Sequence, residues 1–208
     1  MTGPPESAVL RAEQAAPFIA ACCRLPFRTV VDLGCGWGLH TAQFAAAGRD
    51  AVGIDRTLPP GAASGGVTLR QADWLSLPGE YDAGYSWHCL EHTADPLAAL
   101  AAWRRFVRRW LFVGVPRYSR RLTCSHLYNG WNIGQLAYLL ALSGWDCREG
   151  RFLRLGETVC GIVERAPDVP TPQAEGWGPV ADRMPAIFRL GPGVNHVPAD
   201  FDRLNWYA

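Results

Sequence analysis

The sequence contains no lysine, so arginine supplies all 20 of its strongly basic side chains. Alongside abundant Ala, Gly, Arg and Pro, this absence is typical of a GC-rich bacterial coding sequence. The chain also lacks net charge of either sign, since 20 arginines balance 19 acidic residues to give +1 at pH 7. Such a chain has no long-range field to collect nucleic acid or an anionic membrane. Composition therefore gives no strong nucleic-acid signal.

Two further absences narrow the class of protein. The seven cysteines include no Cys-x-x-Cys pair, which excludes a zinc ribbon and a thioredoxin-like motif. The longest apolar stretch near the start, residues 15–23, is interrupted by Pro17 and is far shorter than the roughly 20 residues of a membrane span. No basic leader precedes it. We therefore expect a cytoplasmic protein with reduced thiols and no membrane partner.

What the sequence does contain is an alternation of β-type and α-type patterns. Strands are predicted at residues 29–33, 51–55, 67–71, 81–87, 110–115, 146–154 and 158–164, and helices at 6–24, 40–47, 95–109 and 132–143. Alternation predicts a parallel sheet with helices on both faces, and the short connection at 155–157 predicts a final antiparallel hairpin. The fold class is therefore α/β, a doubly wound, Rossmann-like, seven-stranded sheet. In this class a ligand lies at the carboxyl ends of the strands.

Two connecting segments depart from this alternation. Residues 56–66 hold too much Pro and Gly for a crossover helix, so a loop is predicted there. Residues 166–208 are rich in proline but also in aromatic residues, which disordered tails lack. We expect residues 1–165 to form the domain, beginning with a helical segment at 1–28. Residues 166–208 should form an ordered arm, packed on the domain or joining two copies as a homodimer.

Residues 30–38 read Val-Val-Asp-Leu-Gly-Cys-Gly-Trp-Gly, a β-branched run followed by glycines at alternate positions. This pattern predicts a buried strand that turns abruptly beneath a ligand, because glycine alone lets the backbone approach so closely. A dinucleotide-binding turn would need a glycine at position 39, which is Leu39. Asp32 would repel a phosphate but can hold an ammonium group. The predicted ligand is therefore S-adenosylmethionine.

An acidic residue followed by Gly-x-Gly-x-Gly resembles the first motif of the class I S-adenosylmethionine-dependent methyltransferases, and the resemblance covers roughly residues 29–164. Asp55 ends the second predicted strand, where a carboxylate can accept both ribose hydroxyls. Asp73 matches the family's adenine-binding aspartate, and Trp74 offers a stacking surface. The resemblance implies S-adenosyl-L-methionine as cofactor, bound by Asp32, Gly34, Cys35, Gly36, Gly38, Asp55, Arg56, Asp73, Trp74 and His88.

A dense polar cluster follows the fourth predicted strand, at residues 86–92. His88-x-x-Glu91-His92 spells a zinc-protease motif, but that motif requires a helix, and these residues leave the tip of a strand. Leu90-Glu91-His92 followed by an acidic-proline pair instead resembles the Leu-Glu-His subgroup of small-molecule methyltransferases. This resemblance implies that His88, His92 and His126 face the acceptor as catalytic residues, acting as a base or orienting group.

A metal is the alternative for the same cluster. A subset of the family, including ubiquinone-pathway O-methyltransferases and small-RNA 2′-O-methyltransferases, ligates a divalent ion through Glu-x-x-Glu-His. This sequence has His88 where that subset has its first glutamate. The leading interpretation therefore assigns no metal, and Glu91, His92 and His126 are the alternative ligand set.

The arginines form two groups. Those at 104, 105, 108 and 109 fall at the end of a predicted helix and read as a solvated face away from the cofactor. Those at 117, 120 and 121 follow the fifth predicted strand, on the catalytic side, where a carboxylate or phosphate of the acceptor could be met. Arg117 is assigned to the acceptor together with Trp87, and a purely structural role stays open.

Together these features predict methyl transfer from S-adenosylmethionine to an oxygen or nitrogen of a small-molecule acceptor. The nearly minimal core could also leave an open cleft, so the first alternative is a methyltransferase for RNA or another macromolecule. The second alternative is a non-catalytic protein that keeps the cofactor pocket and serves as a partner of another protein.

Overall fold

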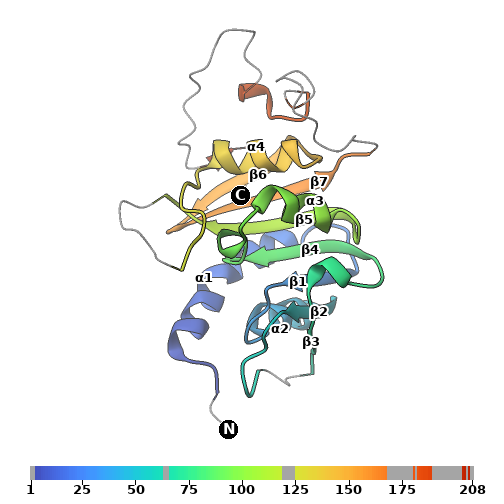
Figure 1. Cartoon of the computed structure of the whole chain (residues 1–208), viewed down its shortest axis with the longest axis vertical. Helices are drawn as coiled ribbons and strands as arrows, with labels where there is room; N and C mark the ends of the chain where they lie inside the picture. Colours follow the sequence, from blue (N-terminus) through green and yellow to red (C-terminus); the bar gives the residue numbers. More distant parts are fainter. Residues whose placement is uncertain are drawn as a thin grey trace.

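One mixed sheet organises the chain, as the computed structural model in Figure 1 shows. The structure describes residues 3–62, 66–118, 125–167, 180, 182–188, 203–204 and 206. The strands are β1 (Thr29–Leu33), β2 (Asp50–Asp55), β3 (Thr68–Gln71), β4 (Tyr81–Trp87), β5 (Val107–Pro116), β6 (Trp145–Leu155), β7 (Thr158–Arg165) and β8 (Arg203–Leu204). The helices are α1 (Glu6–Cys22), α2 (Leu39–Ala46), α3 (Pro96–Trp103) and α4 (Ile133–Leu142), with 3-10 turns η1 (Trp74–Ser76), η2 (Leu90–His92) and η3 (Ala186–Phe188).

The strand order is β3-β2-β1-β4-β5-β7-β6-β8. The first five strands in sequence are parallel to one another, whereas β7 runs antiparallel to β5 and β6 antiparallel to β7. This confirms the predicted seven-stranded, mostly parallel sheet with its antiparallel hairpin. The short strand β8, which was not predicted, pairs with the outer edge of β6. The strand order reverses beside β1, so the carboxyl ends of β1 and β4 flank the switch point where ligands bind in this fold.

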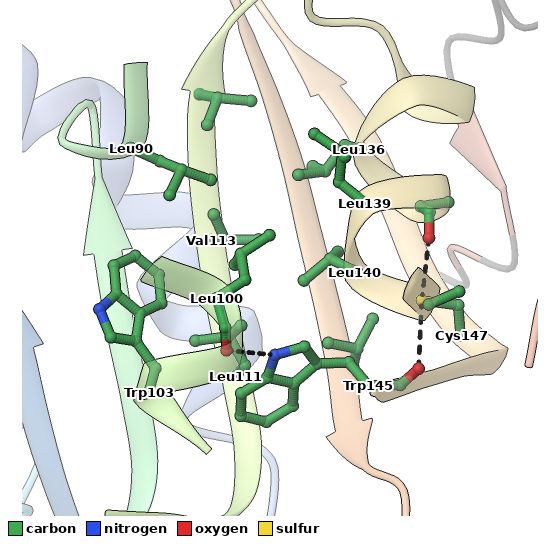
Figure 2. Packing of buried hydrophobic residues seen from close by; sticks show 14 of the residues in the cluster. Leu90, Leu100, Trp103, Leu111, Val113, Leu136, Leu139, Leu140, Trp145 and Cys147 are labelled. Atoms are coloured by element: carbon green, nitrogen blue, oxygen red, sulfur yellow. Dashed lines mark hydrogen bonds between the residues drawn. The ribbon is translucent and has the colours of Figure 1, made fainter. Parts of the chain in front are cut away.

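Helices cover both faces of the sheet, as predicted, and each face has its own core. Figure 1 shows α3 and α4 in front of the strands, and their side chains pack with Trp103 and Trp145, both fully buried. Figure 2 shows how the Trp145 indole in this core donates a hydrogen bond to the Leu100 carbonyl, at 3.1 Å. On the opposite face, α1 and α2 bury Phe18 and Phe44 against the sheet. Successive side chains of a strand point to opposite faces, so both faces need apolar residues.

The predicted helix over residues 95–109 is wrong beyond Trp103. Asp95 caps α3 by accepting a hydrogen bond from the Ala98 N–H at 2.9 Å, but the chain re-enters the sheet at Val107. Two arginines placed on the helix end therefore project from β5, where Arg109 pairs with Glu164 at 3.0 Å. The apolar residues of this segment, at 106, 107 and 110, fit either a helical or a strand period, and pairing with β4 selects the strand.

Two other predicted segments are described only in part. Residues 56–62 and 66–67 contain no helix, in agreement with the predicted loop between β2 and β3. Most of the predicted arm at 166–208 lies outside the described residues, and so do Arg120 and Arg121. The described part of the arm includes Trp206, whose ring stacks on Phe18 with centroids 6.1 Å apart. No helix within the described parts of the chain is both long and apolar enough to cross a bilayer.

Candidate active site

A cavity opens at the carboxyl ends of β1, β2 and β4. Its wall includes six residues of the predicted site, namely Gly34, Asp55, Arg56, Trp74, His88 and His92. It also includes residues that the sequence did not single out, namely Ile54, Ala72, Cys89 and Thr93. The carboxyl edge of the sheet therefore brings together groups that are spread over 60 positions of the sequence, since the wall runs from Gly34 to Thr93.

The glycine turn forms one wall of this cavity, and a side chain would not fit at its start. Gly34 has φ of +81°, and a Cβ there would lie 2.4 Å from the Cys89 sulfur. Its N–H donates to the Ile54 carbonyl at 2.8 Å, which ties the turn to β2. Gly36 has φ of +50°, and a Cβ there would meet nothing within 4 Å. The middle of the turn therefore presents bare backbone to open space, as a ligand-bearing turn requires.

Asp55 connects β2 to that turn. Its Oδ2 accepts a hydrogen bond from the Gly36 N–H at 2.9 Å, and its Oδ1 accepts one from the Thr57 N–H at 3.1 Å. The same carboxylate lines the cavity. Asp55 thus both fixes the position of the turn and offers its remaining lone pairs to a ligand.

Asp32 lies behind the turn rather than in the cavity wall. Its side chain is 1% exposed, and Oδ2 accepts a hydrogen bond from Thr41 Oγ1 at 2.7 Å. Burial raises the pKa of this carboxyl to about 7, an effect that the Thr41 hydrogen bond opposes. The neighbouring Cys35 is buried as well, and burial raises the pKa of its thiol. Gly38, with φ of +74°, immediately precedes α2.

Asp73 and Trp74, which follow β3, differ in whether they line the cavity. Asp73 begins η1, where its carboxylate accepts a hydrogen bond from the Leu75 N–H at 2.9 Å, and it is not part of the cavity wall. Trp74 does line the cavity, and its ring meets Trp103 edge to face at 5.6 Å. The cavity therefore has an aromatic surface, positioned by the core on the α3 face.

His88 directly follows β4 in a left-handed conformation, with φ of +51°. Its Nε2 lies 2.8 Å from Thr158 Oγ1, and its ring stacks on the buried Trp87 with centroids 5.5 Å apart. Burial lowers the pKa of His88 to about 4, with a further contribution from the positive charge of Arg11. At neutral pH this imidazole is therefore uncharged. Trp87 itself is only 6% exposed and packs with the core on the α1 face.

Glu91, His92 and His126 converge beside the cavity, with one possible ligand atom from each lying within 4.8 Å of the others. Glu91 is fully buried, and neither of its carboxylate oxygens has a hydrogen-bond partner among the described residues. Burial raises its pKa to about 7. The carbonyl of Glu91 accepts hydrogen bonds from the Leu127 and Tyr128 N–H groups at 2.8 and 3.1 Å. These bonds hold the segment that carries His126 against η2.

The hydrogen bonding of His92 determines which of its nitrogens is free. Nδ1 lies 2.8 Å from the Ser125 carbonyl oxygen, which can only accept, so Nδ1 carries the proton. In the neutral ring Nε2 is then unprotonated, and it lies 3.9 Å from Glu91 Oε1. A histidine held in this way by a backbone carbonyl has the tautomer of a typical metal ligand.

This geometry and its Rossmann-like frame define a class I S-adenosylmethionine-dependent methyltransferase. The chain belongs to the methyltransferase domain family, because a family model of that description matches residues 10–149. The family resemblance seen in the sequence is thereby confirmed.

Individual relatives agree with this assignment. The ubiquinone biosynthesis O-methyltransferase of Methylococcus capsulatus is 37% identical over 139 residues, which cover 61% of this chain and 53% of that protein. The enzyme of the same name from Cereibacter sphaeroides is 36% identical over 97 residues, covering 40% of this chain and 39% of its own. The chain thus spans about half or less of the length of these curated relatives.

Solved structures share the fold. The 1,6-didemethyltoxoflavin-N1-methyltransferase of Burkholderia thailandensis superposes with a TM-score of 0.63 at 20% identity, covering 75% of this chain and 78% of that one. The magnesium protoporphyrin IX methyltransferase of Synechocystis has a TM-score of 0.56 at 19% identity, covering 74% and 78%. Both structures were solved with S-adenosylhomocysteine or S-adenosylmethionine bound.

Proposed function

We propose that this protein binds S-adenosylmethionine in the cavity at the glycine turn and transfers its methyl group to an oxygen or nitrogen of a small-molecule acceptor. The observation that carries the proposal is the bare turn at Gly36, fixed by a hydrogen bond to Asp55, which also lines the cavity. A turn open to space and a neighbouring carboxylate fit an adenosyl ligand, whose ribose hydroxyls can donate to Asp55. Trp74 provides a flat surface for the adenine ring.

The sulfonium of the bound donor supplies a reactive methyl group, so the protein chiefly has to align the acceptor and exclude water. Alignment of this kind is worth roughly 7 to 11 kcal/mol of a reaction barrier. His88 lines the cavity at the end of β4 and stacks on the buried Trp87, so its ring can hold the acceptor in one orientation. His92 projects from η2 into the same cavity wall.

Proton removal from the acceptor is assigned to the histidines. His88 is uncharged at neutral pH, but its low pKa makes it a weak proton acceptor, and its Nε2 already contacts the Thr158 hydroxyl. His88 therefore serves better to orient the acceptor than to hold its proton. In its neutral form His92 has an unprotonated Nε2 beside the cavity, so the base role is assigned first to His92. A positioned base of this kind contributes about 10²- to 10⁴-fold to the rate.

The small-molecule acceptor is favoured over the two alternatives. The relatives named as ubiquinone biosynthesis enzymes and the structural neighbours act on small molecules by their names, which supports a small acceptor here. A net charge of +1 offers no broad basic face for RNA. A non-catalytic partner protein would not need the histidine cluster. A bacterial origin accords with the organisms of these relatives, and a cytoplasmic location without a membrane partner stays part of the proposal.

The proposal is tested by calorimetric titration of the protein with S-adenosylhomocysteine, followed by an acceptor screen that detects released S-adenosylhomocysteine. We expect saturable binding and turnover with at least one small phenol, amine or hydroxyl compound, which His92→Ala should slow by about 10²-fold or more. Absence of binding would contradict the proposal. If S-adenosylhomocysteine binds but no acceptor is turned over, and His92→Ala leaves this binding unchanged, the non-catalytic alternative would be favoured.

A divalent ion at Glu91, His92 and His126 is a second possibility that one observation favours. A buried carboxylate without a hydrogen-bond partner is costly, and it is tolerated where a cation or another donor approaches it. Two imidazoles and one carboxylate suit transition-metal ions such as Mn²⁺ or Zn²⁺. An ion there would polarise an acceptor oxygen. His88 is not part of this set, since its Nε2 contacts Thr158.

Thermal unfolding with and without Mn²⁺ distinguishes a metal site from a metal-free cluster. At an ion concentration about 100-fold above its Kd, the melting temperature should rise by about 5 to 10 °C, whereas Glu91→Gln should abolish the rise. Glu157→Gln is the matched control, because Glu157 is an exposed carboxylate on the same edge of the sheet. An equal rise in the Glu91 variant would show that the ion binds elsewhere.

A further inference from the structure

The first half of α1 extends past the carboxyl edge of the sheet. Phe18, in the second half of this helix, contacts Trp87, the last residue of β4, with ring centroids 5.8 Å apart (Figure 1). From α1 the chain continues to Thr29, at the amino edge of the sheet where β1 begins. Residues that precede Phe18 therefore lie towards the opposite edge, where the cavity opens. Arg11 is seven residues earlier, which corresponds to about 10 Å along a helix axis.

Arg11 lies on the side of α1 that faces the sheet, although it is itself exposed. Residues 11, 15 and 18 are spaced by four and three positions, so their side chains share one face of the helix. Ala15 and Phe18 are fully buried in the core on the α1 face, whereas Arg11 is exposed. Burial therefore ends where the helix passes the edge of the sheet, and Arg11 projects beyond the end of β4.

Helix α2 fixes this part of α1 beside the cavity wall. The Ala12 carbonyl accepts a hydrogen bond from Gln43 Nε2 at 2.9 Å. His40, at the start of α2, packs edge-on against Trp87 with ring centroids 6.0 Å apart. Trp87 in turn stacks on His88, which lines the cavity. A continuous series of contacts thus joins the first half of α1 to the methyl-transfer site.

The positive charge of Arg11 reaches this site. Burial lowers the pKa of His88 to about 4, and the charge of Arg11 adds to this effect. Burial also lowers the pKa of His40 to about 4, where the Arg11 carbonyl opposes the change and the Arg11 charge reinforces it. The other charges that act on His88 belong to imidazoles. A guanidinium keeps its charge at neutral pH, whereas an imidazole can lose it. An acceptor beside His88 is therefore exposed to a permanent positive charge.

The guanidinium of Arg11 is available to a ligand. Its Nε donates to the Ser7 carbonyl at 3.1 Å, and Arg11 forms no ion pair with any residue in the described parts of the chain. Arg117, which the sequence assigned to the acceptor, is by contrast paired with Glu157 at 3.2 Å and lines a separate cavity. The two terminal nitrogens of Arg11 can thus donate charge-assisted hydrogen bonds to an anionic oxygen.

We propose that Arg11 is a specificity-determining residue of the methyl-transfer site, where it favours an acceptor whose reacting oxygen is negatively charged, such as a phenolate, over an amine. A nearby cation stabilises an ionised hydroxyl group, but it opposes the positive charge that an amine nitrogen gains when it is methylated. This inference rests on the proposed methyl transfer and extends it, because it chooses between oxygen and nitrogen as the methylated atom.

The atoms and charges of the step balance for an anionic oxygen. The acceptor hydroxyl first loses its proton to Nε2 of His92. The oxygen then uses a lone pair to form its bond to the methyl carbon, while the carbon–sulfur bond breaks and its electron pair stays on sulfur. An oxyanion and a sulfonium cation thus become an ether and the thioether of S-adenosylhomocysteine, which are both neutral. Arg11 acts before the transfer, on the ionisation of the bound acceptor.

The test uses 4-nitrophenol and 4-nitroaniline, which have the same shape but carry a hydroxyl and an amine. Each is titrated into the full chain saturated with S-adenosylhomocysteine, and the absorbance of nitrophenolate reports ionisation of the bound probe between about pH 5 and pH 9. We expect Arg11→Gln to raise the pKa of bound 4-nitrophenol by about one unit. The phenolate should then bind about tenfold more weakly. Binding of the uncharged 4-nitroaniline should not change.

Two variants control this experiment. Arg11→Lys keeps a positive charge, so it should retain most of the low pKa of the bound probe. Arg24→Gln removes an exposed arginine just beyond the other end of α1 and should behave as the unmodified protein does. Arg11→Met serves if Arg11→Gln does not fold. The other titratable groups on the acceptor side are the same in all these proteins, namely His40, His88, Glu91, His92 and His126.

Three results would overturn the role of Arg11. They are an unchanged pKa of bound 4-nitrophenol in Arg11→Gln, an equal loss of 4-nitroaniline binding in that variant, and no binding of the phenolate to the protein loaded with S-adenosylhomocysteine. In each case the proposed methyl transfer stands if S-adenosylhomocysteine binds normally. If S-adenosylhomocysteine itself does not bind, the proposed function is wrong and the role of Arg11 falls with it.

Discussion

Asp55→Asn is expected to weaken the binding of S-adenosylhomocysteine by about 100-fold. The wild-type carboxylate accepts hydrogen bonds from the N–H groups of Gly36 and Thr57, and under the proposed function it also accepts from the ribose. An asparagine can supply only one accepting oxygen, and its amide hydrogens would face one of these donors. Loss of hydrogen bonds to a charged group costs about 1.5 to 3 kcal/mol, which accounts for an effect of this size.

Calorimetry on two matched variants measures this effect. Asp50→Asn is the control, because Asp50 begins the same strand, lies at its opposite end and is exposed beside Arg28. It should bind S-adenosylhomocysteine as the unmodified protein does. If both variants bind with the same affinity, Asp55 does not contact the ligand and the glycine turn does not depend on it.

Asp32→Asn is expected to stabilise the protein increasingly as the pH rises. The folded protein holds the Asp32 proton up to about pH 7, whereas the unfolded chain releases it near the ordinary value of 3.8. Between these values the folded state binds more protons than the unfolded state, so the free energy of unfolding falls as the pH rises. The asparagine variant lacks this loss, and its carbonyl oxygen can still accept the hydrogen bond from Thr41.

Urea unfolding of both proteins at pH 5 and pH 8 tests this prediction. The stability difference should widen by about 2 to 3 kcal/mol in favour of Asp32→Asn between these two pH values. Glu91 also has a raised pKa, but it is present in both proteins, so the difference isolates Asp32. A constant difference across this range would mean that Asp32 is ionised in the folded protein at pH 5.

The strands and the glycine turn could be predicted from the sequence because each of their signals is local. Residues 29–33 carry a β-branched run, and the glycines that follow can adopt the positive φ angles that the tight turn requires. The end of α3 could not be predicted, because Phe106 and Val107 fit a helical or a strand period equally well. Only the pairing of Val107 with Tyr81, which is 26 positions earlier, selects the strand.

For the site as well, only the features set by local sequence could be predicted. Asp55 and His88 were predicted to meet because both end strands of one parallel sheet, and the structure places them in one cavity wall. The burial of Asp32 could not be predicted, since it depends on Thr41 and on the helix that carries it. A separate cavity at the carboxyl end of β5 was not predicted, although the sequence assigned one of its wall residues, Arg117, to the acceptor. Its wall is completed by the start of α4 and by Arg154, which approach β5 only through tertiary packing.

The contact between Phe18 and Trp206 has a consequence for the order of folding. The two rings stack although they come from α1 and from the residues after β8, so the contact closes a loop of nearly the whole chain. Contacts between residues so distant in sequence form slowly, after local structure has gathered. During synthesis on the ribosome, α1 therefore leaves the exit tunnel long before its aromatic cover is made. Until then the aromatic rings that contact Phe18 are Tyr85 and Trp87, so β4 can cover α1 before the end of the chain does.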